Sequence, residues 1–292
     1  MILFKKTGDL TGWLKEQRKQ GRSIGFVPTM GALHAGHISL IDISKRVTDS
    51  TVCSIFVNPT QFNDPKDFQK YPVTLEKDIF LLERSGTDVL YLPEVGEIYP
   101  RGMQNLEKYP LGRLETILEG KYRPGHFQGV CQVMRRLLEG VGPDQLFMGR
   151  KDYQQCMVVA RLLELMGSGT VLVPCPIVRE ADGLAMSSRN LRLSEEERKR
   201  ATAIYRALNL LKEGWSRKEE MEKLIQRAKG VLEEAAFRID YVEIADGSTL
   251  KPVTAFRETA KTDNDDAVTP NEVVALIAAF QGDVRLIDNM VL

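Results

Sequence analysis

Two of the three histidines in this 292-residue chain, His34 and His37, lie three residues apart in the segment 28–37, PTMGALHAGH. Gly31 and Gly36 in the same segment allow the backbone to come close to a ligand. The segment follows a strand-like run and opens a helical pattern, and a helix N-terminus offers N–H groups and a positive dipole end to phosphate. Imidazoles at this spacing can donate together to the oxygens of a polyphosphate. A single histidine is more often structural, but this pair in a glycine-containing turn predicts a nucleotide-phosphate site.

A second segment suited to phosphate is 186–190, MSSRN, which follows the glycine-containing stretch 179–185, READGLA. Such a loop can close over a triphosphate, with its hydroxyls donating hydrogen bonds and Arg189 making a charge-assisted contact. On its own, Ser-Ser-Arg is an ordinary polar linker. The H-x-G-H arrangement, however, resembles the signature of nucleotidyltransferases and class I aminoacyl-tRNA synthetases, whose second signature is a K-M-S-K-S-like loop. The two segments together therefore predict a nucleotide site that a loop closes.

Three further segments carry polar side chains next to predicted elements. Residues 56–62, FVNPTQF, place the amide of Gln61 where it can hold a hydroxyl and a carboxylate of a small substrate. Residues 122–130, YRPGHFQGV, open a helix, and residues 149–155, GRKDYQQ, direct a cation, a carboxylate and two amides to one edge of the sheet. Taken singly, each segment is equally well explained as a helix cap or a surface turn.

The elements that must position these residues alternate strands with helices over residues 1–175. Short apolar runs predict strands at 24–28, 51–57, 88–92, 145–148 and 170–173. Apolar residues at three- and four-residue spacing predict helices at 38–48, 74–84, 127–139 and 153–166. This alternation predicts an α/β fold with βαβ crossovers and a mostly parallel, Rossmann-like sheet. In such a sheet, ligands bind beyond the carboxyl ends of the strands.

The composition changes after about residue 178, and we predict a smaller α+β domain over 179–292. Ser194 followed by three glutamates is typical of a capped helix start, and this helix is expected to run to about Glu213. A charged helix over about 217–236 and strands at 239–245, 273–280 and 284–287 complete the domain. The acidic stretch 261–270, KTDNDDAVTP, is expected to be a mobile loop.

Charge and composition exclude several classes of protein. Forty basic and forty acidic side chains give a net charge of zero, so an anionic ligand needs a local site rather than a global field. The four cysteines lack the spacing of a zinc site or a disulfide framework and are expected to be buried, reduced thiols. The N-terminus lacks a secretory apolar region, and the longest apolar run, 273–280, is far shorter than the ~20 residues of a membrane span. We therefore expect a cytoplasmic protein with no nucleic-acid or membrane partner.

Taken together, the five polar segments resemble the pantoate–β-alanine ligase (pantothenate synthetase) family. The resemblance runs through nearly the whole chain and is densest between residues 24 and 191. It is specific because related adenylyltransferases share H-x-G-H but not N-P-x-Q-F, R-P-G-H-F or K-D-Y-Q-Q. The family adenylates (R)-pantoate with ATP, releasing pyrophosphate, and the β-alanine amine then displaces AMP from pantoyl adenylate, in pantothenate and coenzyme A biosynthesis. The resemblance implies this reaction here.

The resemblance also implies roles at the nucleotide site. His34 and His37 donate to the phosphates, with His37 the best candidate for proton donor or transition-state stabiliser. Lys151 and Arg189 offset the negative charge of the phosphates. The implied ATP site comprises Met30, Gly31, Ala32, Leu33, His34, Ala35, Gly36, His37, Gly149, Arg150, Lys151, Asp152, Val178, Met186, Ser187, Ser188 and Arg189.

Gln61 and Gln155 are implied to hold pantoate, and Gln61 also lies where β-alanine arrives. Residues 1–178 are then a domain that binds ATP and pantoate, and residues 179–292 are a lid domain that carries the MSSRN loop. Mg²⁺ is expected with ATP and is coordinated chiefly by the phosphates, so no protein metal site is predicted. The resemblance further implies a homodimer.

The chain departs from the family pattern at two places. Arg150 replaces the glutamate that commonly precedes the lysine of K-D-Y-Q-Q. Its positive charge could tighten ATP binding, or its side chain could point to solvent, and we favour the second interpretation. The acidic stretch 261–270 is longer than the family pattern leads us to expect. It is distant in sequence from every motif and leaves the predicted activity intact.

Two other functions are weighed against this one. An adenylyl- or cytidylyltransferase that moves a nucleotide onto a phosphate ester would share the H-x-G-H turn. Gln61 and Gln155 argue against it, because an acceptor phosphate calls for cations at those positions. A non-catalytic nucleotide-binding regulator would make the two histidines dispensable for every activity.

Overall fold

The computed structural model describes residues 1–254 and 272–292 and divides the chain into two compact units. The first unit comprises residues 1–178 and 186–188, and the second comprises residues 179–185 and the chain from 189 onward. The expected loop at 261–270 lies outside the described residues. No helix within the described residues is long and apolar enough to cross a membrane.

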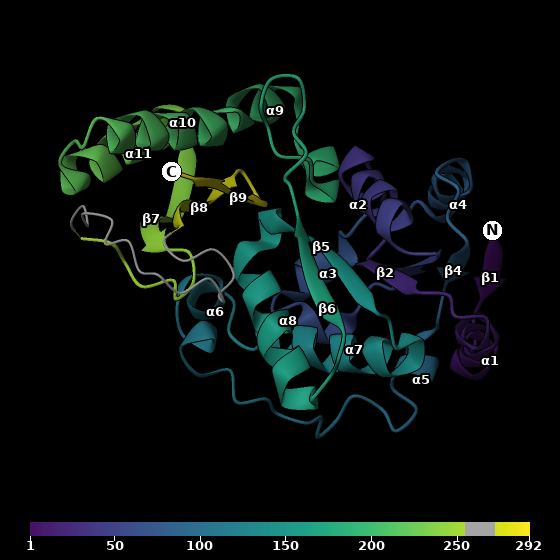
Figure 1. The fold of residues 1–292 in the computed structure, drawn as a ribbon. Helices are drawn as coiled ribbons and strands as arrows, with labels where there is room; N and C mark the ends of the chain where they lie inside the picture. The colour runs from purple at the N-terminus through teal and green to yellow at the C-terminus, as the bar shows by residue number, and fades with distance from the viewer. Residues whose placement is uncertain (255–271) are drawn as a thin grey trace. The chain divides into compact units, whose positions relative to one another are not determined.

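The first unit is built on a six-stranded parallel sheet with the order β1-β4-β3-β2-β5-β6 (Figure 1). Its strands are β1 (Ile2–Phe4), β2 (Ile24–Thr29), β3 (Ser50–Ile55), β4 (Val89–Tyr91), β5 (Gln145–Gly149) and β6 (Val171–Cys175). The chain runs outward from β2 to β4 and then returns to place β5 on the other side of β2. The strand order therefore reverses between β2 and β5, which is where ligands bind in open α/β sheets.

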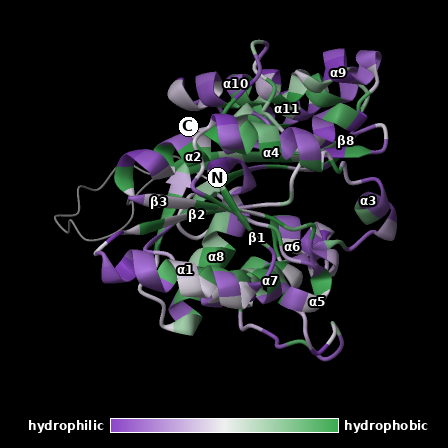
Figure 2. Ribbon diagram, turned by 90° about the vertical axis from the view of Figure 1, so that its right-hand side faces the viewer, coloured by the Kyte–Doolittle hydropathy of each residue, from purple (hydrophilic) through white to green (hydrophobic). Residues whose placement is uncertain are grey.

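Helices cover both faces of this sheet because successive strand residues point to opposite sides. Phe26 and Val52 pack with the buried sides of α1, α7 and α8, whereas Val27 and Cys53 pack with α2 and α4. The helices of the unit are α1 (Thr7–Lys19), α2 (Ala35–Val47), α3 (Pro65–Gln69), α4 (Leu75–Arg84), α5 (Val95–Ile98), α6 (Leu118–Tyr122), α7 (His126–Val141) and α8 (Tyr153–Met166). Figure 2 shows hydrophilic and hydrophobic residues mixed along the helices, as amphipathic packing requires.

The second unit, within the described residues, packs helices on a three-stranded antiparallel sheet of order β7-β8-β9. Its elements are α9 (Glu195–Ala201), α10 (Ala203–Ser216), α11 (Met221–Glu234), β7 (Phe237–Asp246), β8 (Val273–Gln281) and β9 (Val284–Val291). The Ser194 hydroxyl accepts from the Glu197 N–H and the Glu197 carboxylate accepts from the Ser194 N–H, which confirms the predicted cap. The single helix expected to run to Glu213 is wrong, because the chain divides at Thr202 into α9 and α10.

These elements confirm the predicted fold class, a parallel Rossmann-like sheet followed by a smaller α+β region. All four cysteines lie in the described part of the chain and are buried free thiols, as expected. One detail of the predicted division differs: Met186–Ser188 belong to the first unit rather than to the C-terminal one. The reason is local bonding, because the Met186 N–H donates to the Val178 carbonyl at 3.0 Å and the Ser188 hydroxyl donates to the Ala32 carbonyl at 3.0 Å.

Candidate active site

The segment 28–37 forms a tight turn between β2 and α2 at the point where the strand order reverses. Gly31 and Ala32 both adopt positive φ, at 80° and 47°. A side chain at position 31 would also press on its neighbours, since a Cβ there would lie 3.1 Å from Asp78 Oδ2 and 3.2 Å from Ile55 Cγ2. The turn thus needs glycine at position 31 both for its backbone conformation and for its close packing.

The two histidines of this turn form the N-terminal cap of α2 together. His34 Nδ1 accepts from the Gly36 N–H at 3.1 Å, and His37 Nδ1 accepts from the His34 N–H at 3.3 Å. Their rings lie with centroids 4.1 Å apart. A ring nitrogen that accepts from a backbone N–H cannot carry a proton, so the neutral rings are protonated on Nε2. Both Nε2–H groups are then donors held in one place by the backbone.

The surroundings keep both rings neutral. Burial and the positive charge of Lys151 lower the pKa of His34 to about 4, against an opposing effect of Asp152. Burial, His34 and Lys151 hold the pKa of His37 well below its ordinary value. Of the two roles predicted for His37, stabilisation of charge by a neutral hydrogen-bond donor is therefore favoured over proton donation by an imidazolium.

These lowered pKa values predict a loss of stability in acid. Below about pH 6.5 the unfolded chain binds more protons at these histidines than the folded chain, and for His34 the difference persists to about pH 4. The free energy of unfolding should therefore fall as the pH drops through this window. His34→Asn keeps an N-cap acceptor but does not titrate, so it should lose less stability than the wild type. Urea unfolding at pH 7 and pH 5 measures both losses, and equal losses would contradict the assignment.

The backbone N–H groups of the turn are already bonded within the protein. The Gly31 N–H donates to Thr29 Oγ1 at 3.2 Å. The Ala32 and Leu33 N–H groups donate to the carboxylate of Asp78 at 2.9 and 2.8 Å. These three N–H groups are therefore engaged within the protein, and they precede the helix N-terminus, which begins at Ala35 and to which the sequence-based prediction of phosphate donors refers.

The segment after β5 brings charge to the neighbouring strand end. Gly149 closes β5, and Arg150–Asp152 form a single 3₁₀ turn before α8. Lys151 Nζ lies 3.5 Å from Asp152 Oδ2, and the charge of Lys151 is close enough to affect both histidines. Arg150 is only partly exposed, with its guanidinium carbon 5.8 Å from the ring centroid of Tyr153.

The predicted nucleotide loop is divided between the two units. Ser188 is buried against the turn through its bond to Ala32, and Met186 Cβ lies 3.7 Å from the place where a Cβ on Gly36 would be. Val178 holds the start of this loop through its bond to Met186. Arg189 belongs to the second unit.

In the second unit, the stretch 179–185 is a small hairpin anchored to β9. Arg179 Nη1 and Nη2 lie 2.5 and 3.0 Å from the two carboxylate oxygens of Asp288, whose side chain is only 2% exposed. Arg179 Nη1 also donates to the Gly183 carbonyl at 3.1 Å, and its guanidinium lies over the ring of Tyr205 at 4.6 Å. A buried, bidentate ion pair thus fixes the segment that leads into the MSSRN loop. Nothing in the sequence signals this role for Asp288, because its partner Arg179 lies 109 positions away.

Gln61 ends a 3₁₀ turn, Pro59–Gln61, beyond β3, and its amide is oriented by a buried neighbour. Asn58, which is 1% exposed, donates from Nδ2 to Gln61 Oε1 at 3.1 Å. The Gln61 Nε2 group therefore turns toward Met30, whose sulfur it contacts at 3.1 Å. A thioether is a weak acceptor, so this N–H can exchange it for a substrate oxygen.

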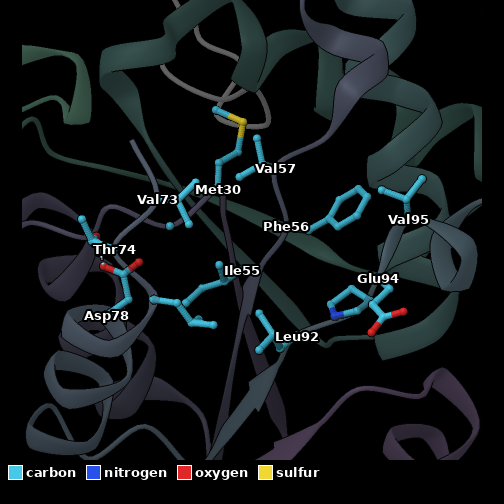
Figure 3. Close-up of a pocket in the computed structure, with 13 residues that line it drawn as sticks. Met30, Ile55, Phe56, Val57, Val73, Thr74, Asp78, Leu92, Glu94 and Val95 are labelled. Atoms are coloured by element: carbon cyan, nitrogen blue, oxygen red, sulfur yellow. Dashed lines mark hydrogen bonds between the residues drawn. The ribbon is translucent and has the colours of Figure 1, made fainter. Parts of the chain in front are cut away.

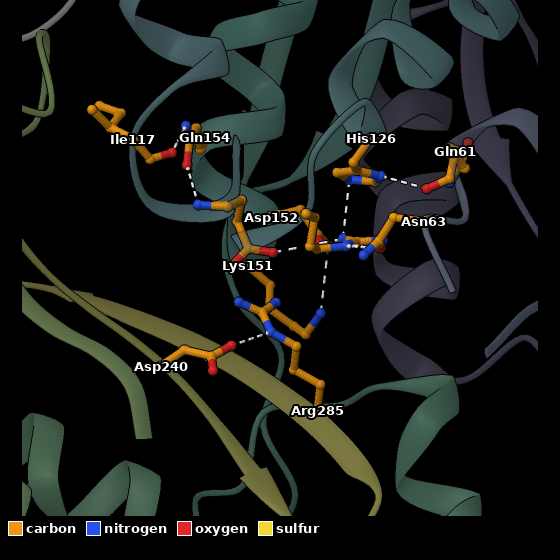
Figure 4. Close-up of polar contacts among 11 residues, drawn as sticks. Gln61, Asn63, Ile117, His126, Lys151, Asp152, Gln154, Asp240 and Arg285 are labelled. Atoms are coloured by element: carbon orange, nitrogen blue, oxygen red, sulfur yellow. Dashed lines mark hydrogen bonds and ion pairs between the residues drawn. The ribbon is translucent and has the colours of Figure 1, made fainter. Parts of the chain in front are cut away.

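The third histidine, His126, holds the backbone of Gln61 (Figure 4). Arg123 Nη1 lies 3.0 Å from His126 Nε2, and because a guanidinium only donates, Nε2 is the acceptor. The proton is then on Nδ1, which donates to the Gln61 carbonyl at 2.7 Å. The segment 122–130 thus contributes a structural histidine that positions Gln61.

The 3₁₀ turn Pro59–Gln61 packs so closely on Gly129 that adding one methyl group there should destabilise the protein. A Cβ on Gly129 would lie 2.2 Å from the Thr60 carbonyl oxygen, so Gly129→Ala must displace the turn that carries Gln61. We expect a loss of about 1–3 kcal/mol in the free energy of unfolding, from overpacking. The matched control is Gly230→Ala in α11, where no described heavy atom lies within 4 Å of the new Cβ. It should be neutral or stabilising by about 0.5–1 kcal/mol, and urea denaturation compares the two.

The two glutamines of K-D-Y-Q-Q have different surroundings. Gln154 is buried, and its Nε2 donates to the Ile117 carbonyl at 3.0 Å (Figure 4). Its Nε2 also donates to the Leu114 carbonyl at 2.8 Å, and its Oε1 accepts from the Glu119 N–H. The expectation that both amides face the ligand edge is therefore wrong for Gln154, which fixes a loop. The Gln155 side chain makes no hydrogen bond within the described residues and is partly exposed.

An apolar pocket of about 460 Å³ lies beside the turn and was not predicted (Figure 3). Met30 and Gly31 contribute to it, together with Ile55, Phe56 and Val57 at the end of β3. The remaining lining residues are Val73, Thr74, Leu75, Asp78, Leu92, Pro93, Glu94 and Val95. Its position beyond the strand ends agrees with the general rule for ligand sites in such sheets.

Comparisons with known proteins identify the family of this chain. The family described as Pantoate-beta-alanine ligase matches residues 2–291. The chain belongs to the pantoate-beta-alanine ligase family. The "Pantothenate synthetase" of Caldicellulosiruptor bescii is 41% identical over 293 residues, which cover 100% of this chain and 99% of that relative.

Solved structures of this ligase family have the same fold. The crystal structure of pantothenate synthetase from Thermus thermophilus superposes with a TM-score of 0.89 at 37% identity and covers 99% of each chain. The ligase from Francisella tularensis, complexed with beta-gamma ATP and beta-alanine, has a TM-score of 0.79 at 36% identity and covers 100% of this chain and 97% of that one. The resemblance of the five polar segments is therefore confirmed at the level of family and fold.

Proposed function

We propose that this protein condenses (R)-pantoate with β-alanine to give pantothenate, at the expense of ATP, through a pantoyl adenylate. The observation that carries the proposal is the pair of neutral imidazoles capping α2, both with Nε2–H groups available at the switch point of a nucleotidyltransferase sheet. Membership of the ligase family supports it, as does the relative whose structure was solved with an ATP compound and beta-alanine.

The first step forms the mixed anhydride. A carboxylate oxygen of pantoate attacks the α-phosphorus of ATP, and the bond from that phosphorus to the bridging oxygen of pyrophosphate breaks. Negative charge grows on the phosphate oxygens, where the Nε2–H groups of His34 and His37 donate and Lys151 and Arg189 supply positive charge. Donors that are already oriented do not need to reorganise as the charge develops.

The second step forms the amide. The neutral amine of β-alanine attacks the acyl carbon of the adenylate, AMP leaves with the electron pair of the acyl–oxygen bond, and the nitrogen releases one proton to solvent. Holding amine and adenylate in one site converts a bimolecular reaction into one between neighbours. We assign Gln61 to this region because its amide N–H faces only a weak thioether acceptor, and Gln155 because its amide is not engaged by the described residues.

The ATP site proposed is the one that the resemblance implies, with the turn 30–37, the segment 149–152, Val178 and the loop 186–189. Support comes from the bond between the turn and Ser188, from the bond between Val178 and Met186, and from the effect of Lys151 on both histidines. Mg²⁺ is proposed to enter with ATP. The described residues hold no group of three His, Cys, Asp or Glu side chains suited to a metal ion, so phosphate and water are the ligands we expect.

We also propose a homodimeric, cytoplasmic enzyme, as the family resemblance implies. Sedimentation velocity of the purified chain tests the oligomeric state. A single species of 32.9 kDa at all concentrations would contradict the dimer.

A coupled assay tests the activity. With ATP, pantoate and β-alanine present, we expect AMP, pyrophosphate and pantothenate in equal amounts. Without β-alanine, we expect at most about one pyrophosphate released per active site. Without pantoate, we expect no turnover. Pyrophosphate release that does not depend on pantoate would reject the ligase and favour a nucleotidyltransferase with another acceptor.

A further inference from the structure

Asp78, on α4, is a buried carboxylate that contacts the histidine turn directly. It is 1% exposed, and both of its oxygens are used. Oδ2 accepts from the Ala32 N–H at 2.9 Å, and Oδ1 accepts from the Leu33 N–H at 2.8 Å. Oδ1 also accepts from the Thr74 hydroxyl at 3.0 Å (Figure 3). Burying a carboxylate is costly unless hydrogen bonds compensate it, and here two of the three donors belong to the turn.

The turn needs such a partner because its backbone is strained. Ala32 has a φ of 47°, which a residue with a Cβ adopts at a cost of about 1–3 kcal/mol. Its carbonyl also accepts from the buried Ser188 hydroxyl, so both sides of the residue are held. A conformation of this kind persists only where surrounding contacts determine it, and Asp78 supplies two contacts to successive peptide groups.

Any displacement of the turn also displaces both proposed phosphate donors, His34 and His37. Leu33 is followed by His34, whose ring caps α2 and whose N–H bonds to the ring of His37. Because the rings are joined in this reciprocal way, a shift at Ala32 and Leu33 moves both Nε2–H groups together. Misplacing a catalytic group by about 1 Å can cost about 10²-fold in rate.

We infer that Asp78 is a positioning residue of the adenylation step: it holds the left-handed turn so that His34 and His37 present their Nε2–H groups to the phosphates. The inference rests on the proposed function. An amide cannot replace the carboxylate, since an asparagine side chain has one acceptor oxygen and its NH₂ group would face one of the two backbone N–H donors. Both carboxylate oxygens of Asp78 are engaged by the turn and by Thr74, so we assign it a positioning role that acts through the turn.

The test compares Asp78→Asn with Thr74→Ala. The second variant removes a hydrogen bond that the Asp78 carboxylate accepts from a side chain outside the turn, so it serves as the matched control. Steady-state pyrophosphate release gives kcat and KM for ATP, and urea unfolding gives the stability of each variant. We expect Asp78→Asn to lower kcat about tenfold or more, with KM for ATP changed less, and Thr74→Ala to stay within about threefold of the wild type.

Amide hydrogen exchange provides a second measurement, made on the turn itself. The Ala32 and Leu33 amide protons should exchange faster in Asp78→Asn than in Thr74→Ala when both are compared under conditions that keep them folded. If Asp78→Asn does not fold, Asp78→Glu replaces it in the test, because glutamate keeps the charge but displaces the carboxylate oxygens. The same limits on kcat and KM then apply. A kcat for the Asp78 variant within threefold of Thr74→Ala, despite lower stability, would overturn the inference and leave a structural role. A wild type without pantoate-dependent turnover would instead reject the proposed function.

Discussion

We expect His37→Asn to lower the rate of pyrophosphate release by ~10² to 10³ while the protein remains folded. The asparagine oxygen lies near the place of the imidazole Nδ1, so it can still accept from the His34 N–H and preserve the cap of α2. The donor at the Nε2 position is lost. The variant therefore removes the proposed interaction with the phosphates and leaves the interaction that maintains the fold.

The matched variant is His37→Gln, whose amide nitrogen reaches toward the position of Nε2 and can still donate. It should lose the cap bond but retain more of the rate than His37→Asn. Single-turnover pyrophosphate release with saturating ATP and pantoate measures the chemical step, and thermal unfolding monitors the fold. If His37→Asn stays within tenfold of the wild type, His37 does not stabilise the adenylation transition state.

The central strands and their helices could be predicted because local sequence determines them. β3 is a continuous buried run, β2 is buried except at Pro28, and α7 ends where Gly142 takes a positive φ of 55°. The elements that were not predicted have weak local signals. β1 is a three-residue strand with exposed Ile2 and Leu3, and α1 contains two glycines and buries only three of its side chains.

The histidine turn was also predictable, since residue type, spacing and glycines coincide in ten residues. The groups that orient it were not, because their partners are distant in sequence. Asp78 bonds to residues 46 and 45 positions earlier, and Asn58 bonds across to Gly129. One signal was present: Asp78 lies three residues after Leu75 and four before Leu82, on the buried side of α4. A carboxylate at such a position requires a specific partner.

The adjacent glutamines illustrate the same limit. Consecutive residues of a helix point about 100° apart, so Gln154 and Gln155 cannot share surroundings. Composition does not reveal which of the two faces the loop 114–119 and which faces away. The structure assigns the loop contacts to Gln154. The pantoate role proposed for Gln155 therefore rests on its unengaged amide rather than on the motif alone.

The second large effect is expected for Gln61→Ala, which should raise KM for pantoate by about 10- to 10²-fold. Hydrogen bonds to charged groups contribute about 1.5–3 kcal/mol, and 1.4 kcal/mol corresponds to a factor of ten. The effect should fall mainly on the acyl substrate, because the oxygen of Gln61 is already bound by Asn58 and its nitrogen contacts a weak thioether acceptor that a substrate oxygen can replace. The affinity for ATP should change less than threefold.

Initial rates at varied pantoate and saturating ATP give KM for pantoate. Initial rates at varied ATP and saturating pantoate give KM for ATP. Gln69→Ala makes the same chemical change at an exposed position at the end of α3 and should leave both KM values unaltered. The backbone of Gln61 is held independently by His126, so removing the side chain does not release the turn, and a change in KM reports on the amide. Equal losses of affinity for pantoate and for ATP would exclude Gln61 from the acyl site and would place its role in maintaining Met30 and the nucleotide turn.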